Sequence, residues 1–313
     1  MLARIANNLF WMGRYVERAE NMARFIKVHL FSTLDTTTED KKKYMFKSIL
    51  TMVGLDEIYE YPEEGITNEP EFFEYLSVDL DNFSSILFSI KCARENARGA
   101  RDSISTDVWN TMNLFYHGAM EYNKKEFTNE VIYTFCDFII KNCAIIYSQI
   151  ETTLLHNEVT NFLKLGIFIE RASQTVRIVY SKSLAIEDII KDGSNPNLIT
   201  HEYMNMLKCA EAYDMSKKYY RSVPSNDQVL EFLIFNTMFP KSIHYNLNGI
   251  IRNLKKLSET KQFSKESLEY KVTRWITLFG YSDLSQIKNL KEFLDETLDE
   301  IYKIAFELEQ KYM

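Results

Sequence analysis

The residues best suited to chemistry lie near the amino terminus, where guanidinium, carboxylate and amide side chains recur at helical spacing. Placed on an α-helix at about 100° per residue, one side of this stretch carries Arg14, Glu17, Arg18 and Asn21, with Arg24 at its edge. The opposite side is an uninterrupted apolar stripe of Ile5, Leu9, Met12, Val16, Ala19, Ala23 and Leu30. Phe10 and Phe25 bracket the polar face, which indicates that this face is covered as well. Covered charges must be paired or must hold a ligand, so the polar face is a candidate site.

The same pattern returns in the middle of the chain with the same internal spacing. Five residues have identical counterparts in the second copy: Gly13, Glu17, Arg18, Ala19 and Arg24 match Gly166, Glu170, Arg171, Ala172 and Arg177. A weaker echo follows each copy, as Phe83-Ser84-Ser85-Ile86 and Phe239-Pro240-Lys241-Ser242-Ile243, each opening a predicted helix. These repeats predict an internal duplication, with halves of about 1–156 and 157–313 that superpose and share one core.

A third polar group lies on the helix predicted for residues 83–104. It consists of Arg94, Glu95, Arg98, Arg101 and Asp102, with Asn96 among them in the sequence. This helix and the first one both concentrate Arg and Glu on one side, where Lys would serve solubility alone. We therefore predict that helix 3–34 packs beside helix 83–104, so that Arg14, Glu17, Arg18 and Asn21 face Arg94, Glu95, Arg98 and Arg101.

Two interpretations of these charged faces stay open. In the structural one, Glu17 and Glu170 accept hydrogen bonds from arginines of neighbouring helices and fix the register of the bundle, because the guanidinium fork matches a carboxylate. In the functional one, spare guanidinium groups form an anion pocket. The arginines Arg14, Arg18, Arg24, Arg94, Arg98 and Arg101 outnumber the carboxylates Glu17, Glu20, Glu95 and Asp102. If the two helices meet, positive charge is left over, and unpaired buried charge is expensive unless it is used.

Other chemistries lack their sequence signatures. There is no Glu-x-x-His motif for a carboxylate-bridged iron site, and the five histidines are well separated along the chain. Neither a Gly-x-Ser-x-Gly elbow nor a glycine-rich phosphate loop occurs. The four cysteines form no Cys-x-x-Cys pair, which indicates core thiols in a reducing compartment. We therefore expect no metal and no cofactor, and the sequence assigns no catalytic residue.

The composition predicts an all-α fold. Only nine glycines and five prolines occur among 313 residues, which favours long helices over sheets and tight turns. We expect one domain over 1–313, a large helical bundle of about ten to twelve helices. The predicted helices cover residues 3–34, 41–52, 71–77, 83–104, 105–122, 128–156, 157–191 and 200–221, and others begin after Ser225, at Pro240 and after Asp283. The net charge of −7 without a basic tract argues against nucleic-acid binding as the main role.

The chain has no predicted membrane segment. The best candidate, residues 131–140, is short and interrupted by Asp137. The amino terminus enters an amphipathic helix directly, without the pattern of a signal peptide. These features predict a cytoplasmic protein.

The chain resembles the alpha-E family of bacterial helical proteins, which is named for a Glu-Arg motif. The resemblance rests on Met1-Leu2-Ala3-Arg4 leading into Trp11-Met12-Gly13-Arg14-Tyr15-Val16-Glu17-Arg18-Ala19-Glu20-Asn21, on Ala93-Arg94-Glu95-Asn96-Ala97-Arg98-Gly99-Ala100-Arg101-Asp102, on Ser105-Thr106 with Trp109 and Asn113, on the second Glu-Arg copy, and on Glu231-Phe232-Leu233 with Phe239-Pro240-Lys241-Ser242. In the family the second copy usually has Arg after the glycine. Here Ile167 stands at that position, which weakens the second copy as a charged site. The resemblance implies as partners ATP-grasp ligase-like and transglutaminase-like proteins of a peptide-synthesis or peptide-tagging system.

Two functions from different classes follow from these observations. In the first, the chain is a non-catalytic partner whose arginine-rich site holds a peptide carboxylate, another anion or an acidic segment of a partner. In the second, it is an enzyme that uses Glu17 or Glu95 as an acid or base in an arginine-lined cleft. The first is favoured, because the sequence offers no nucleophile, metal set or cofactor loop. A closed ion lattice would favour a scaffold, and an open pocket with a perturbed carboxylate beside unpaired arginines would favour chemistry.

Overall fold

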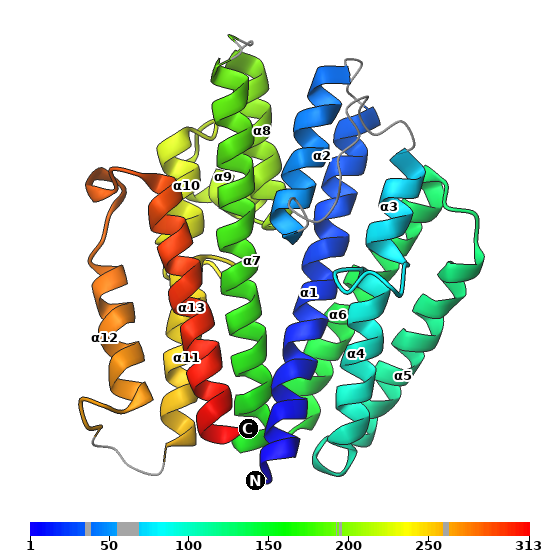
Figure 1. The fold of residues 1–313 in the computed structure, drawn as a ribbon, viewed down its shortest axis with the longest axis vertical. Helices are drawn as coiled ribbons and strands as arrows, with labels where there is room; N and C mark the ends of the chain where they lie inside the picture. Colours follow the sequence, from blue (N-terminus) through cyan, green and yellow to red (C-terminus); the bar gives the residue numbers. More distant parts are fainter. Residues whose placement is uncertain (35–38, 55–68, 192, 194–195, 259–262) are drawn as a thin grey trace.

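The computed structural model describes residues 1–34, 39–54, 69–191, 193, 196–258 and 263–313. Every regular element in these ranges is helical (Figure 1), so the all-α prediction is confirmed. The α-helices are α1 (Ala3–Leu34), α2 (Glu39–Val53), α3 (Glu69–Ser77), α4 (Ile86–Gly99), α5 (Thr106–Met120), α6 (Asn129–Thr153), α7 (Glu158–Lys191), α8 (Pro196–Cys209), α9 (Tyr213–Tyr220), α10 (Asn226–Ile234), α11 (Ile243–Leu257), α12 (Leu268–Gly280) and α13 (Leu290–Tyr312). Three short 3-10 helices accompany them at Arg101–Ser103, Glu121–Lys124 and Leu284–Gln286. The described ranges thus hold one α-helix more than the upper limit predicted.

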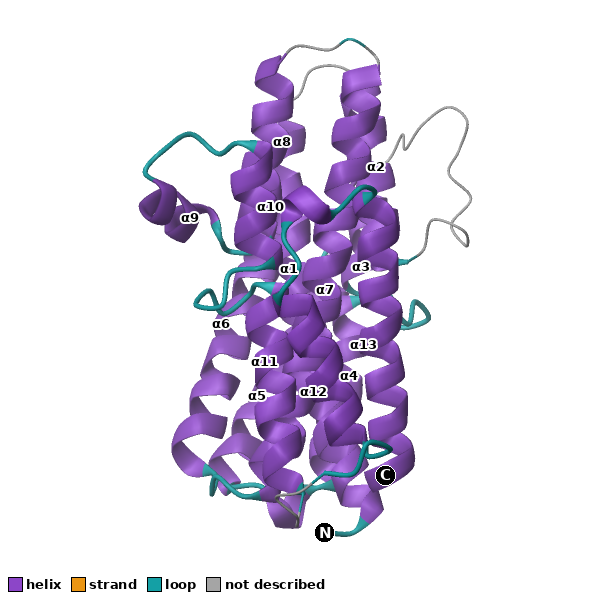
Figure 2. Cartoon of the chain, turned by 90° about the vertical axis from the view of Figure 1, so that its left-hand side faces the viewer, coloured by secondary structure: helices purple, strands orange, loops and turns teal. Residues whose placement is uncertain are grey.

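The two longest helices, α1 and α7, run side by side through the centre of the molecule (Figure 1). Helices α4 and α6 pack on α1, while α11 and α13 pack on α7, and most helices follow the long axis of the molecule (Figure 2). The buried apolar side chains form one continuous cluster that spans both groups, from Phe10 on α1 to Ile169 on α7. A single core therefore joins the first and second parts of the chain.

The two Ser residues of the weaker sequence echo have the same local structure. Ser85 Oγ accepts from Phe88 N at 3.1 Å and caps α4, and Ser242 Oγ accepts from Tyr245 N at 3.1 Å and caps α11. Each Oγ also donates to the carbonyl oxygen six residues earlier in the chain. Equivalent motif residues thus occupy equivalent roles in the two parts, whereas the superposition of complete halves stays a prediction.

Several predicted helix boundaries were wrong, because local capping geometry decided them. The helix predicted for 200–221 is two helices, α8 and α9, and Pro196 begins α8 instead of preceding it by several residues. Glu211 adopts a left-handed backbone with φ of 55°, and the Ala212 N to Leu207 O bond of 2.7 Å closes the end of α8. Similarly, α11 begins after the Ser242 cap and not at Pro240, and Asn289 caps the last helix in place of Asp283.

Helix α6 is, among the described residues, the one helix long and apolar enough to cross a membrane. The prediction that no stretch reaches this length and hydropathy was wrong, since the apolar pattern continues well beyond Ile140 and Asp137 interrupts it only once. The buried side of α6 packs against α1 and α5. Only part of its apolar surface is therefore buried in the core, since 33% of the most apolar window is buried.

Candidate functional site

Helices α1 and α7 cross with their backbones in close contact, and two glycines make that contact possible. A Cβ added to Gly166 would lie 2.0 Å from the carbonyl oxygen of Phe10, and one added to Gly13 would lie 2.3 Å from that of Leu163. No side chain fits at either position, so the motif glycines set the distance between the helices. The residues that follow each glycine are thereby brought face to face.

The Glu-Arg motifs of the two helices pair reciprocally. Glu170 Oε1 accepts from Arg18 Nε at 2.7 Å, and Glu170 Oε2 accepts from Arg14 Nε at 2.8 Å and from Arg18 Nη2 at 3.1 Å. In the opposite direction, Glu17 Oε1 and Oε2 accept from Arg171 Nε and Nη2 at 2.8 and 2.7 Å. We call these five residues, Arg14, Glu17, Arg18, Glu170 and Arg171, the Glu-Arg clamp.

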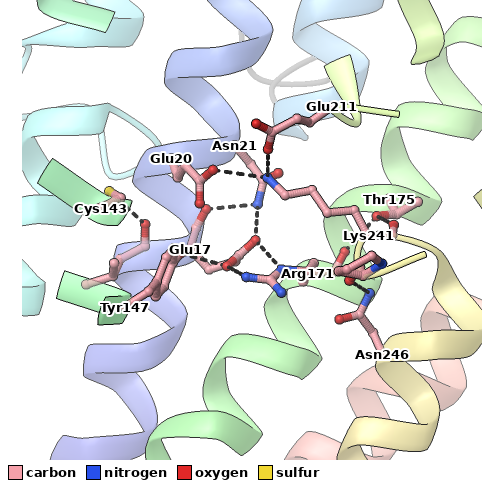
Figure 3. A network of polar contacts seen from close by, with 12 residues as sticks. Glu17, Glu20, Asn21, Cys143, Tyr147, Arg171, Thr175, Glu211, Lys241 and Asn246 are labelled. Atoms are coloured by element: carbon pink, nitrogen blue, oxygen red, sulfur yellow. Dashed lines mark hydrogen bonds and ion pairs between the residues drawn. The ribbon is translucent and has the colours of Figure 1, made fainter. Parts of the chain in front are cut away.

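Uncharged donors complete the shell around both carboxylates. Asn21 Nδ2 donates to Glu17 Oε1 at 2.9 Å, and Gln174 Nε2, at the same spacing in the second copy, donates to Glu170 Oε1 at 3.0 Å. The hydroxyl of Tyr147 on α6 donates to Glu17 Oε2 at 2.7 Å (Figure 3). Because Ile167 replaces an arginine in the second copy, Glu17 has one guanidinium partner where Glu170 has two, and Tyr147 supplies the remaining charge-assisted bond.

The arginines of the clamp hold the Glu170 carboxylate ionised in the protein interior. Glu17 is fully buried and Glu170 is nearly so. Burial alone would raise the pKa of Glu170, but Arg18 and Arg14 outweigh it and hold that pKa well below its ordinary value. Burial, followed by the charge of Glu17, raises the pKa of Tyr147 well above its usual range, so this phenol stays a donor. The clamp therefore matches the structural interpretation of the motif.

A second buried network lies one turn further along α1. Glu20 Oε1 accepts from Arg24 Nη2 at 2.7 Å and from Lys241 Nζ at 3.0 Å, and the same two cations reach Glu211 Oε2 at 3.1 and 3.2 Å. The backbone of Lys241 is held by Thr175 of α7, whose hydroxyl donates to its carbonyl oxygen (Figure 3). Burial would raise the pKa of Glu20, but Lys241 and Arg24 lower it to about 2. This network fastens the segment before α11 to α1.

Arg177, the counterpart of Arg24, has a different role. Its Nη1 donates to the carbonyl oxygen of Met52 at 3.3 Å, and its Nη2 donates to the hydroxyl of Tyr302 at 2.9 Å. It thus joins α7 to the end of α2 and to α13.

The predicted pairing between α1 and α4 was wrong, although the two helices do pack together. Glu95 is paired with Arg94 at 2.8 Å and with Arg98 at 2.5 Å on its own helix, and Arg94 Nε donates to Asn113 Oδ1 of α5 at 2.8 Å. Arg101 lies over the ring of Trp109, also on α5. The remaining members of the set are Asn96, which donates to Cys92 O, and Arg98 and Asp102, which are exposed. The polar face of α1 faces α7 instead. At the glycine crossing the two backbones are close enough for arginines of each helix to pair with the glutamate of the other.

An open pocket of about 450 Å³ adjoins the clamp between α6, α7 and α11. Its charged lining residues are Glu151, Lys164, Arg171, Arg252 and Lys256, and its other lining residues are Tyr147, Ile167, Phe168, Tyr245 and Asn253. We call this the cationic pocket. Arg171 is the one clamp residue that belongs to both, since it pairs with Glu17 and also lines the pocket. The clamp therefore borders the pocket through Arg171.

The described ranges contain no group of three or more His, Cys, Asp or Glu side chains arranged to hold a metal ion.

Several residues of the site were not predicted from the sequence: Tyr147, Gln174, Glu211, Lys241, Arg252 and Lys256. Gln174 could have been found, because it repeats the position of Asn21 four residues after the glutamate. The others come from helices or turns that only the fold brings to α1 and α7.

Comparison with known proteins identifies one family along the whole chain. The family profile named Alpha-E, described as a predicted alpha-helical domain with a conserved ER motif, matches residues 1–313. Uncharacterized proteins of Mycobacterium bovis and of Mycobacterium tuberculosis strain CDC 1551 are each 34% identical over 118 residues, which is 34% of this chain and 13% of each relative. The match therefore spans only a small part of these longer relatives. No solved structure matches the chain.

Proposed function

We propose, from the premise that this chain belongs to the Alpha-E family, that it is a non-catalytic helical partner in a cytoplasmic peptide-synthesis or peptide-tagging system. Its partners in this proposal are an ATP-grasp ligase-like protein and a transglutaminase-like protein, as the family resemblance implies. Its own contribution is to bind: it presents a rigid helical surface and holds the carboxylate of a peptide or an acidic segment of a partner.

The observation that carries this proposal is the closure of the Glu-Arg clamp. A general acid or base must reach a substrate proton with a free oxygen. Glu17 accepts from Asn21, Tyr147 and Arg171, and its side chain is fully buried. Glu170 is enclosed in the same way by arginines. The motif residues are therefore better suited to fixing two helices than to moving protons.

The alternative of an enzyme finds less support among the other reactive groups. Glu95 is tied to Arg94 and Arg98 on the surface of α4. Burial raises the pKa of both Cys136 and Cys209 to about 12, which keeps these thiols protonated and away from any substrate. Binding is thus favoured over chemistry.

The test is reconstitution with the ligase-like partner encoded by the same organism. The full chain carrying an affinity tag is expected to co-purify with that partner, and addition of the chain is expected to raise the yield of ligated peptide. The chain incubated alone with ATP and peptide should form no product. Product formation by the chain alone, lost in Glu17→Gln or Glu95→Gln variants that keep their melting temperature, would overturn the proposal in favour of the enzyme.

A further inference from the structure

We infer that the cationic pocket between α6, α7 and α11 is a binding site for a compact dianion, a group with two neighbouring negative charges on oxygen. Two sources share this chemistry: the end of a peptide whose last residue is Asp or Glu, and a phosphate monoester. The inference rests on the proposed binding function and deepens it by locating the site and naming the class of ligand.

The charge balance of the pocket carries the inference. Of its four cations, Lys164 is paired with Glu151 at 2.7 Å and Arg171 is paired with Glu17 at 2.7 Å. Arg252 and Lys256 have no ion pair within the part of the chain that the structure describes. Two positive charges are therefore left without a counter-charge beside a pocket of about 450 Å³. Charge-assisted hydrogen bonds from guanidinium and ammonium groups are the usual means of holding carboxylate or phosphate oxygens.

Aromatic rings fix the two guanidinium groups that face this space. Arg171 lies over the ring of Tyr147 at 5.8 Å, and Arg252 lies over the ring of Phe168 at 6.0 Å. Phe168 reaches α11 because Gly249 has no side chain: a Cβ there would lie 2.7 Å from the ring. Arg171 already uses its Nε and Nη2 groups on Glu17, which leaves Nη1 for a ligand. Arg252 is held by its face and keeps its N–H edge for a ligand, so part of the ordering of this side chain is complete before binding.

The differences between the two motif copies explain why a pocket lies beside the second copy. In the first copy, Arg14 fills the position after the glycine, and its guanidinium lies between Glu170 and the ring of Trp11, 4.7 Å away. In the second copy, Ile167 has that position and Lys164 stands where the first copy has Trp11. The second copy therefore borders the pocket, which Lys164 and Ile167 line. The residue change that weakens its internal pairing leaves room for a ligand, and Arg252 and Lys256 supply the unpaired positive charge.

The experiment is calorimetric titration of the full chain with three probes: acetyl-Ala-Glu with a free carboxyl terminus, the same peptide with an amidated terminus, and inorganic phosphate. The variant is Arg252→Gln with Lys256→Gln, and the matched control is Lys255→Gln, which alters the neighbouring exposed lysine of α11 outside the pocket lining. Because the altered side chains are exposed, the melting temperature should stay unchanged in both proteins.

At least one dianionic probe is expected to bind in roughly the millimolar range or more tightly, with affinity about tenfold or more weaker in the double variant and unchanged in the control. Binding of the free peptide alone identifies the peptide source, and binding of phosphate alone identifies the phosphate source. Three results would overturn the inference: no binding of either dianion, equal binding of the amidated peptide, or equal affinity in the double variant. Because ligase capture is measured separately, failure of one proposal leaves the other standing.

Discussion

At the scale of single residues, the protein keeps the two carboxylates of the Glu-Arg clamp inside its core by surrounding each one with hydrogen-bond donors. Glu17 and Glu170 each accept four side-chain hydrogen bonds, and at least two come from arginine forks. Removing a carboxylate would leave guanidinium groups buried without a counter-charge. Such stranded charges are much more destabilising than the loss of an exposed ion pair.

We predict that Glu17→Gln lowers the free energy of unfolding by roughly 3 kcal/mol and that Glu170→Gln lowers it by at least as much, since the second strands both Arg14 and Arg18. Urea unfolding followed by circular dichroism measures both. Glu121→Gln is the control, because its ion pair with Lys124 is exposed, and it should lower the free energy of unfolding far less than either clamp variant. Equal effects at all three positions would contradict a structural clamp.

Another buried polar group, separate from the clamp and from the network around Glu20, links α1 to α7 and α8. Lys182 Nζ lies 2.8 Å from His29 Nε2 and 3.0 Å from Glu202 Oε2. His29 Nδ1 lies 2.8 Å from the carbonyl oxygen of Phe25, so Nδ1 carries the proton and Nε2 accepts from the lysine. Burial, followed by the charge of Lys182, lowers the pKa of His29 to about 3. His29 is thus a neutral acceptor at neutral pH.

We predict that this histidine makes the protein less stable in mild acid. Its pKa is about 3 in the folded chain and 6.5 when unfolded, so below pH 6.5 the unfolded chain binds one proton more. The free energy of unfolding should fall by about 1.4 kcal/mol per pH unit from that point toward pH 5. Urea unfolding at several pH values measures the slope. The His29→Gln variant should show a flatter slope than the parent protein. Equal slopes in parent and variant would refute the assignment to His29. Burial also lowers the pKa of His244, but this histidine is present in both proteins, so its smaller contribution cancels in the comparison.

At the scale of elements, the glycine crossing decides which helices share charges. Helix α1 packs on both α4 and α7, yet no described ion pair joins its arginines to α4. Arg14 and Arg18 pair with Glu170 of α7, and Arg24 pairs with Glu20 and Glu211. Gly13 and Gly166 remove the side chains that would otherwise separate the backbones. Because the backbones are so close, one arginine side chain and one glutamate side chain together span the distance between the two helices. On α4, the Glu95 carboxylate pairs with Arg94 and Arg98 of its own helix.

We predict that Gly166→Ala lowers the free energy of unfolding by roughly 3 kcal/mol or more, because the new Cβ would lie 2.0 Å from the carbonyl oxygen of Phe10 and neither backbone can yield. The sign of the change in the free energy of unfolding tests the close crossing, since Gly→Ala inside an uncrowded helix stabilises by roughly 0.5–1 kcal/mol. Gly118→Ala in α5 is the matched control, because the atom nearest its Cβ would be Cζ of Phe138, the far end of a side chain that can move. Thermal unfolding compares the three proteins, and a stabilised Gly166→Ala variant would contradict the close crossing.

At the scale of the whole molecule, two groups of helices depend on one another through α1 and α7. Helix α2 packs on α7 and helix α8 packs on α1, so each group also reaches across to the other. The shared hydrophobic cluster has no division between them. Each group alone would expose the apolar sides of its central helix and half of the Glu-Arg clamp.

We predict that residues 1–156 and 157–313, produced separately, each fail to reach native helicity, whereas the two pieces produced together co-purify as a one-to-one complex. The break falls in the turn between α6 and α7, where few contacts are lost. Circular dichroism and size-exclusion chromatography measure the outcome. A single piece that unfolds cooperatively with native helicity would mean that the halves are separate domains.

The sequence by itself determined the helical class and the motif residues that pair. The period of 3.6 residues, the scarcity of glycine and proline and the repeated Gly-Glu-Arg spacing are local properties of the chain. The structure shows them as helices, buried apolar stripes and motif residues that pair with one another. Capping residues with local partners, such as Ser105 before α5, were likewise predictable, because the cap bonds to the next turn of its own helix.

Only the tertiary structure decided which partner each charge meets. Helix α1 could have turned its arginines to α4 or to α7, and nothing in its own periodicity distinguishes the two neighbours. The choice depends on the distance between backbones, which two glycines far apart in the sequence set together. Tyr147, Lys241 and Arg252 joined the site for the same reason, since residues from α6, from the turn before α11 and from α11 become neighbours only after the core has packed.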